Sequence, residues 1–124
     1  DGTFKGRVIG IDVVPELVEW GKQNIAKQHQ EILDSGLIDV KFGNGWKGDP
    51  ANAPFDAIHV GAGAESLPQA LVDQLANGGR LVIPVGKGDQ TFLLVEKDAQ
   101  GKVTKKPLFG CRYVPLVKPS KDEL

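Results

Sequence analysis

The sequence lacks features on which whole classes of protein depend. Its 124 residues include no methionine and a single cysteine, Cys111. One cysteine cannot form an internal disulfide, so the fold does not depend on an oxidising compartment, which fits the cytosol. No apolar run approaches the roughly 20 residues that span a bilayer, and the first residues show no signal-peptide layout. These absences argue against a membrane protein.

An excess of charge of one sign is also missing. Fifteen Lys and Arg residues face sixteen Asp and Glu residues, for a net charge of -1. This balance argues against generic electrostatic binding to nucleic acid or to an anionic membrane. The two histidines and one cysteine show no metal-ligand spacing, so no metal site is predicted. The length and a hydrophobic content of 40% favour one soluble globular domain, residues 1–124.

Short β-branched runs alternate with helical patterns along the chain. Pro15 favours the start of a helix there, and Gly36 ends it. Residues 98–101 carry a hairpin signature. The expected strands are 7–12, 38–42, 55–60, 80–85, 91–95 and 102–108, and the expected helices are 15–34 and 68–75. This order predicts an α/β fold with a mostly parallel sheet and an antiparallel edge hairpin.

Polar residues follow the expected parallel strands at their carboxyl ends, where open sheets bind ligands. Asp12 closes the first apolar run, and a carboxylate there can accept hydrogen bonds from both hydroxyls of a ribose. The alternative is that Asp12 caps the helix that follows. Asn44 can present its carbonyl to an exocyclic amine, while Gly45 lets an adenine approach the backbone. An ordinary Asn-Gly turn is the alternative there.

Three other residues invite functional interpretations, and each also has a structural one. His59 lies in an apolar strand, which favours a buried, hydrogen-bonded histidine over an acid–base catalyst. Cys111 has only Arg112 as a basic neighbour, which favours a structural thiol over a nucleophile. Trp46 follows the candidate adenine site directly, although packing is its default role.

Five stretches taken in order carry a more specific signal: residues 8–12, 43–45, 55–62, 77–86 and 113–116. The most specific are Asp-Ala-Ile-His-Val-Gly-Ala and Gly-Gly-Arg-Leu-Val-Ile-Pro-Val-Gly. Together these stretches closely resemble the protein-L-isoaspartate (D-aspartate) O-methyltransferase family. The resemblance covers nearly the whole chain and implies a Rossmann-like class I methyltransferase sheet.

The resemblance also implies a set of site residues. It implies S-adenosylmethionine as the cofactor, with Asp12 at the ribose, Val13 against the adenine, and Asn44 and Gly45 at the adenine edge. The resemblance also implies that Val117 lies near the cofactor, at a position where family members often carry a threonine. The family usually has Asp in place of Asn44. The residues implied to border the peptide substrate are Pro84, Val85, Arg112, Val114, Pro115 and Leu116.

The implied reaction is methyl transfer to the carboxylate of L-isoaspartyl and D-aspartyl residues in damaged proteins, which initiates their repair. That carboxylate is already ionised near neutral pH, so alignment is a greater demand than proton removal. Damaged proteins are the implied partners, a monomer the implied state of the intact enzyme, and the cytoplasm its implied compartment. The final residues, 121–124, spell Lys-Asp-Glu-Leu, which makes the endoplasmic reticulum the alternative compartment.

Part of the family pattern is expected upstream of Asp1. The missing segments are the glycine-rich cofactor loop and a substrate segment that bears Ser or Thr, so no catalytic residue is named. The absence of methionine agrees with an incomplete methyltransferase domain. Two other functions stay open. An acid at the end of a second strand also holds the ribose of NAD, which would suit a nicotinamide-dependent oxidoreductase fragment. A truncated, inactive binding domain is the other.

Overall fold

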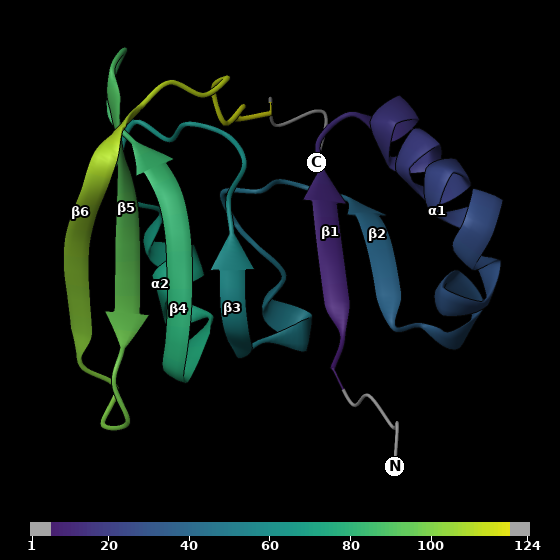
Figure 1. The fold of residues 1–124 in the computed structure, drawn as a ribbon, viewed down its shortest axis with the longest axis horizontal. Helices are drawn as coiled ribbons and strands as arrows, with labels where there is room; N and C mark the ends of the chain where they lie inside the picture. The colour runs from purple at the N-terminus through teal and green to yellow at the C-terminus, as the bar shows by residue number, and fades with distance from the viewer. Residues whose placement is uncertain (1–5, 120–124) are drawn as a thin grey trace. The chain divides into compact units, whose positions relative to one another are not determined.

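The computed structural model describes residues 6–119, which fall into two compact units. Among the described residues, unit 1 consists of residues 6–45 and Pro119, and unit 2 of Trp46–Lys118. The helices and strands of each unit are drawn in Figure 1. No helix within residues 6–119 is long and apolar enough to cross a membrane.

Unit 1 contains a two-stranded parallel sheet and one long helix (Figure 1). Strands β1 (Val8–Asp12) and β2 (Ile38–Phe42) pair over their full length, from Val8 opposite Ile38 to Asp12 opposite Phe42. Helix α1 (Pro15–Ser35) connects them and packs against both. Pro15 starts this helix and Gly36 ends it in a left-handed conformation (φ 80°), as the sequence predicts.

Alternation along the paired strands separates two faces in unit 1. A Cβ on Gly21 of α1 would lie 3.7 Å from Val40 Cγ1, so Val40 faces the helix. Ile9 and Ile11 therefore point to the opposite face, where both are half-buried. The helix also departs from α geometry at His29 (φ −138°, ψ 39°), a kink that the sequence pattern does not predict.

Unit 2 contains a four-stranded sheet in the order β3-β4-β5-β6 and a short helix. Strands β3 (Phe55–His59) and β4 (Leu75–Val85) are parallel, whereas β5 (Gln90–Lys97) and β6 (Val103–Cys111) continue the sheet in antiparallel fashion. Helix α2 (Gln69–Asp73) lies against one face of the sheet (Figure 1). The β5–β6 turn is the predicted hairpin, because Asp98 binds Lys102 through its backbone and side chain.

The hydrophobic core of unit 2 lies between α2 and the sheet. Its buried members are Val60, Ala64, Leu71, Val72, Leu75, Leu81, Ile83 and Val95. Ile58 pairs with Leu81 and faces this core, so its neighbour His59 points to the other face of the sheet. His59 is exposed there. The prediction of a buried histidine was wrong because the alternation of β3 directs His59 away from α2.

Two predicted boundaries in unit 2 were also wrong. Helix α2 is shorter than the expected 68–75, and β4 begins at Leu75 rather than at Arg80. The expected stop signal, residues 77–79, lies inside β4 as a bulge, since the pairing shifts between Phe55–Leu75 and Ala57–Arg80. Gly78 takes a positive φ of 83° there, a conformation that glycine adopts without strain.

Candidate functional site

The carboxyl ends of β1 and β2 carry the residues predicted to hold a nucleoside. The Gly43 N–H donates to the Asp12 carbonyl over 2.9 Å, so the hydrogen bonding between the two strands continues one residue beyond Phe42. Asp12 and Asn44 therefore lie at the same end of neighbouring parallel strands, followed by Val13 and Gly45. The structure thus places four of the five predicted cofactor residues at one end of the sheet of unit 1.

One oxygen of the Asp12 carboxylate has a local role. Asp12 Oδ1 accepts a hydrogen bond from the Val14 N–H over 2.9 Å. Val14 is the N-cap residue of α1, which begins at Pro15, and no side chain caps the helix there. Asp12 therefore orders the turn before the helix instead of capping the helix itself.

The other carboxylate oxygen, Asp12 Oδ2, has no hydrogen-bond partner among residues 6–119. Asp12 is half-buried, and its hydrogen bond with the Val14 N–H fixes the orientation of the carboxylate. Asn44 is also half-buried and interacts with other protein groups. A fixed carboxylate acceptor and an amide side chain at the same end of two paired strands are a donor and acceptor set that fits a ribose and an adenine edge.

The residues predicted to border a peptide lie in unit 2, around the loop that follows β3. Ala64 N–H donates to the Pro84 carbonyl over 2.9 Å, and Gly86 N–H donates to the Ala64 carbonyl over 2.9 Å. On its other side the loop binds residues 112–118, which we call the tail segment. Gly63 N–H donates to the Val114 carbonyl over 2.6 Å. This loop therefore joins the end of β4 to the tail segment.

Further contacts hold the tail segment along its length. Trp46 Nε1 donates to the Leu116 carbonyl over 3.0 Å, and Lys118 Nζ lies 4.4 Å from the centre of the Trp46 ring system. Trp46 and Leu116 both pack against the core of unit 2, so the packing role predicted for Trp46 is confirmed. Val117 is 54% exposed and belongs to unit 2, whereas the other cofactor candidates belong to unit 1.

Arg112 opens the tail segment and forms an exposed ion pair. Its Nε lies 2.7 Å from Asp89 Oδ1, and the two side chains are 82% and 79% exposed. Cys111, just before it, is a half-buried free thiol. Within residues 6–119, no group of three or more His, Cys, Asp or Glu side chains is placed to hold a metal ion.

Sequence reasoning missed two buried glutamines, Gln74 and Gln90, which are 7% and 9% exposed. Each binds the backbone of a loop through both ends of its amide. Gln90 follows a run of Gly, Lys and Asp residues that resembles an exposed turn, so its burial leaves little trace in the sequence. The only local signal is a long uncharged amide at the first residue of an apolar strand.

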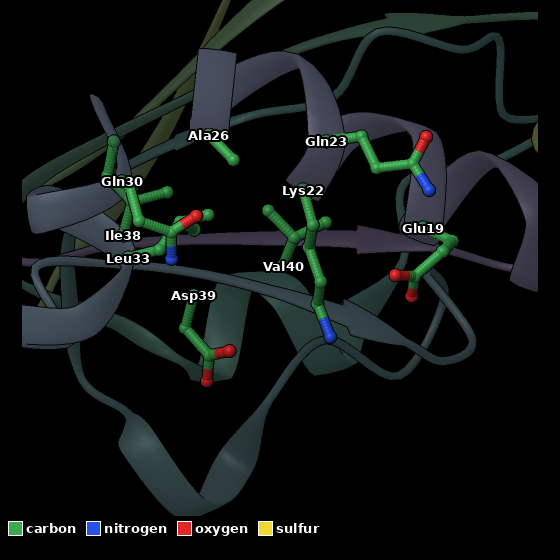
Figure 2. Close-up of a pocket in the computed structure, with 9 residues that line it drawn as sticks. All are labelled: Glu19, Lys22, Gln23, Ala26, Gln30, Leu33, Ile38, Asp39 and Val40. Atoms are coloured by element: carbon green, nitrogen blue, oxygen red, sulfur yellow. The ribbon is translucent and has the colours of Figure 1, made fainter. Parts of the chain in front are cut away.

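An open pocket of about 440 Å³ lies elsewhere in unit 1, between α1 and β2. Figure 2 shows its lining, which combines polar and apolar residues of α1 with three residues of β2. Glu19, Lys22 and Asp39 bring charges of both signs to its walls. None of the residues predicted to bind a cofactor or a peptide lines this pocket, so its position gives no support to the candidate site.

Comparisons with known proteins agree with the family indicated by the sequence. The family model described as Protein-L-isoaspartate(D-aspartate) O-methyltransferase matches residues 3–121. A protein-L-isoaspartate O-methyltransferase of Caenorhabditis elegans is 44% identical over 90% of this chain and 50% of its own length. Protein-L-isoaspartate O-methyltransferase 1 of Arabidopsis thaliana is 47% identical over 90% of this chain and 49% of its own. The chain thus spans about half the length of these relatives.

A solved structure confirms the predicted α/β methyltransferase fold. It is a protein-L-isoaspartate O-methyltransferase of Plasmodium falciparum in complex with S-adenosyl-L-homocysteine. The likeness has a TM-score of 0.80 and 33% identity, and it covers 91% of this chain and 53% of that one. These relatives support neither the oxidoreductase nor the inactive binding domain. The chain belongs to the protein-L-isoaspartate (D-aspartate) O-methyltransferase family.

Proposed function

We propose that the protein transfers a methyl group from S-adenosylmethionine to the carboxylate of L-isoaspartyl and D-aspartyl residues in damaged proteins. The observation that carries this proposal is the likeness to the Plasmodium falciparum enzyme, whose structure holds S-adenosyl-L-homocysteine, the demethylated product of that cofactor. Asp12 and Asn44 support it independently, because they lie at the carboxyl ends of neighbouring parallel strands, where a nucleoside site is expected.

Unit 1 supplies the proposed cofactor contacts. Asp12 Oδ2 would accept from the ribose, Val13 would contact the adenine face, and Asn44 and Gly45 would meet the adenine edge. Val117 of unit 2 is proposed to lie near the same cofactor. When bound, the cofactor supplies a methyl group made electrophilic by its sulfonium.

Unit 2 supplies the proposed peptide contacts, which are Pro84, Val85, Arg112, Val114, Pro115 and Leu116. The bound cofactor would supply the methyl group and, as leaving group, a neutral thioether. These residues would hold an acceptor carboxylate that is already ionised, so no proton would need to be removed. What remains for the protein is to hold the peptide in line and to exclude water, which agrees with a site poor in acid–base groups.

Other properties of the whole protein are part of the same proposal. We propose that its partners are damaged proteins rather than nucleic acids or membranes, that it acts as a monomer, and that both units belong to one methyltransferase domain. The cytoplasm is the proposed compartment, because a single cysteine gives no support to an oxidising one. The retrieval signal at 121–124, which favours the endoplasmic reticulum, lies outside the described residues.

Labelled methyl transfer tests this function. The longest expressed form of the protein is incubated with radiolabelled S-adenosylmethionine and either an isoaspartyl peptide or the same peptide with a normal aspartyl residue. The proposal expects a base-labile label on the isoaspartyl peptide and background on its aspartyl twin. Equal labelling of both peptides, or of neither, would contradict it.

A further inference from the structure

Gln90 holds the tail segment by both ends of one side chain. Its Oε1 accepts a hydrogen bond from the Tyr113 N–H over 2.7 Å, and its Nε2 donates to the Tyr113 carbonyl over 3.3 Å. The side chain therefore pairs with Tyr113 much as a neighbouring strand would. Gln90 is 9% exposed and is the first residue of β5, a long strand inside the sheet, so its amide has a rigid base.

Gly63 holds the next residues of the tail segment. Its N–H donates to the Val114 carbonyl over 2.6 Å, and its carbonyl accepts from the Leu116 N–H over 2.8 Å. The Gln90 amide fills the space where a Cβ on residue 63 would stand, so only glycine fits beside it. Gln90 and Gly63 therefore form one clamp on residues 113–116.

The clamp leaves part of the tail segment open to solvent. Val114 is 72% exposed although its carbonyl is bound. The Pro115 carbonyl makes no hydrogen bond within residues 6–119. Tyr113 is kept in place by its ring as well, which stacks on Phe92 with 6.2 Å between ring centres. An ordered backbone with outward groups is a surface on which an extended chain can dock.

We propose that Gln90 is a positioning residue for the peptide acceptor, one that fixes the tail segment in the place where it meets the substrate. This inference rests on the proposed function. Gln90 is itself buried and acts only through Tyr113 and its neighbours. Because Gln90 acts only through the tail segment, its loss should weaken peptide binding equally in the ground state and the transition state. The signature is then a higher KM with an almost unchanged kcat.

The first experiment replaces Gln90 by methionine, which keeps length and bulk but neither donates to nor accepts from Tyr113. The KM for an isoaspartyl peptide should rise about tenfold, with kcat and the affinity for S-adenosylhomocysteine within about twofold of wild type. Hydrogen exchange of the Tyr113 amide should accelerate by a similar factor. An unchanged KM together with faster exchange at Tyr113 would overturn the inference.

The matched control is Gln74→Met, at the other buried glutamine. Gln74 Nε2 donates to the Lys47 carbonyl over 2.7 Å, and its Oε1 accepts from the Asp49 N–H over 2.9 Å. This variant removes the same kind of paired hydrogen bonds, but from a different loop. We expect it to leave the KM for the peptide and the exchange of Tyr113 unchanged. A KM that rises equally in both variants would mean that Gln90 has only a structural role.

A second variant, at Gly63, disturbs the same clamp and can be used if Gln90→Met folds poorly. In Gly63→Ala the new Cβ displaces the Gln90 amide, which is the far end of a flexible side chain. The KM should rise as in Gln90→Met. Adding Gln90→Ala removes the overlap, so stability should recover while the high KM remains. A KM that returns to the wild-type value would contradict the inference.

A wild-type protein that labels no isoaspartyl peptide would instead overturn the proposed function itself.

Discussion

Units 1 and 2 both pack a helix against a sheet, but they bury very different numbers of hydrophobic side chains. In unit 1 a two-stranded sheet is covered by one helix, and Val18 is the one buried hydrophobic side chain among its described residues. In unit 2 a helix, four strands and the bound loops enclose eight buried hydrophobic residues. A two-stranded sheet is marginal without further packing, so unit 1 depends on α1 far more than unit 2 depends on any one element.

The proposed cofactor residues and the proposed peptide residues are held in position by different interactions. The proposed cofactor residues follow strands that are paired along their full length but thinly buried, so hydrogen bonds such as Gly43 to Asp12 and Val14 to Asp12 fix their positions. The proposed peptide residues lie on segments anchored to a close-packed core. Order at the strand ends of unit 1 therefore rests on hydrogen bonds, whereas order in unit 2 also comes from a close-packed core.

Truncation of a core side chain should give the largest difference between the units. Leu81 is fully buried in unit 2, and Leu81→Ala is expected to lower the free energy of unfolding by about 2–5 kcal/mol. Val18→Ala in unit 1 should cost about 1–2 kcal/mol, because fewer buried atoms are removed. Urea unfolding followed by circular dichroism measures both. A cost for Val18→Ala equal to that of Leu81→Ala would break the comparison.

Glycine substitutions should give a smaller difference. Gly48 in unit 2 has a positive φ of 64°, and its Cβ would stand 2.9 Å from Leu71 Cδ2, so Gly48→Ala is expected to destabilise the protein by about 1–3 kcal/mol. Gly10 in unit 1 has nothing within 4 Å of a Cβ, and Gly10→Ala should stabilise its strand by about 0.5–1 kcal/mol. Thermal unfolding compares the two. Changes of the same sign would show that unit 1 is packed more tightly than described.

The smallest effect is expected at the Arg112–Asp89 pair. Both side chains are largely exposed, so Arg112→Ala should change the free energy of unfolding by less than about 1 kcal/mol. Salt should reduce even that difference, because it screens exposed charges. Urea titrations of wild type and variant at low and high salt measure it. A larger cost that persists at high salt would mean that the pair is buried by groups not described.

Local patterns predicted much of the fold. The strand 38–42 was expected with the bounds that β2 has, and the start and end of α1 follow from Pro15 and Gly36. These features depend on residues close in sequence, namely β-branched runs, a proline and a left-handed glycine. Asp12 and Asn44 were predicted to bind a cofactor for the same reason, since they follow apolar runs typical of strands, whereas Val13 and Val117 were implied only by the family resemblance.

The features that the sequence did not predict depend on distant contacts. His59 looked buried because its neighbours are apolar, yet the face it occupies is decided by which side α2 covers. Residues 77–79 looked like a stop signal, yet pairing with β3 accommodates them as a bulge. The clamp of Gln90 joins residues 23 positions apart, which no local pattern reveals. The roles of the site residues themselves stay predictions.

The decisive measurement for the proposed cofactor site at the end of β1 is the affinity for S-adenosylhomocysteine after substitution of Asp12. Asp12→Asn keeps an oxygen for the Val14 N–H but removes the charge offered to the ribose, and calorimetry should show binding weakened about 10- to 100-fold. Asp39→Asn is the matched control, because Asp39 is an acid of β2 that pairs with Lys41 over 3.8 Å instead. Asp39→Asn should bind S-adenosylhomocysteine with wild-type affinity. Wild-type affinity for Asp12→Asn would contradict the claim that the end of β1 holds the cofactor.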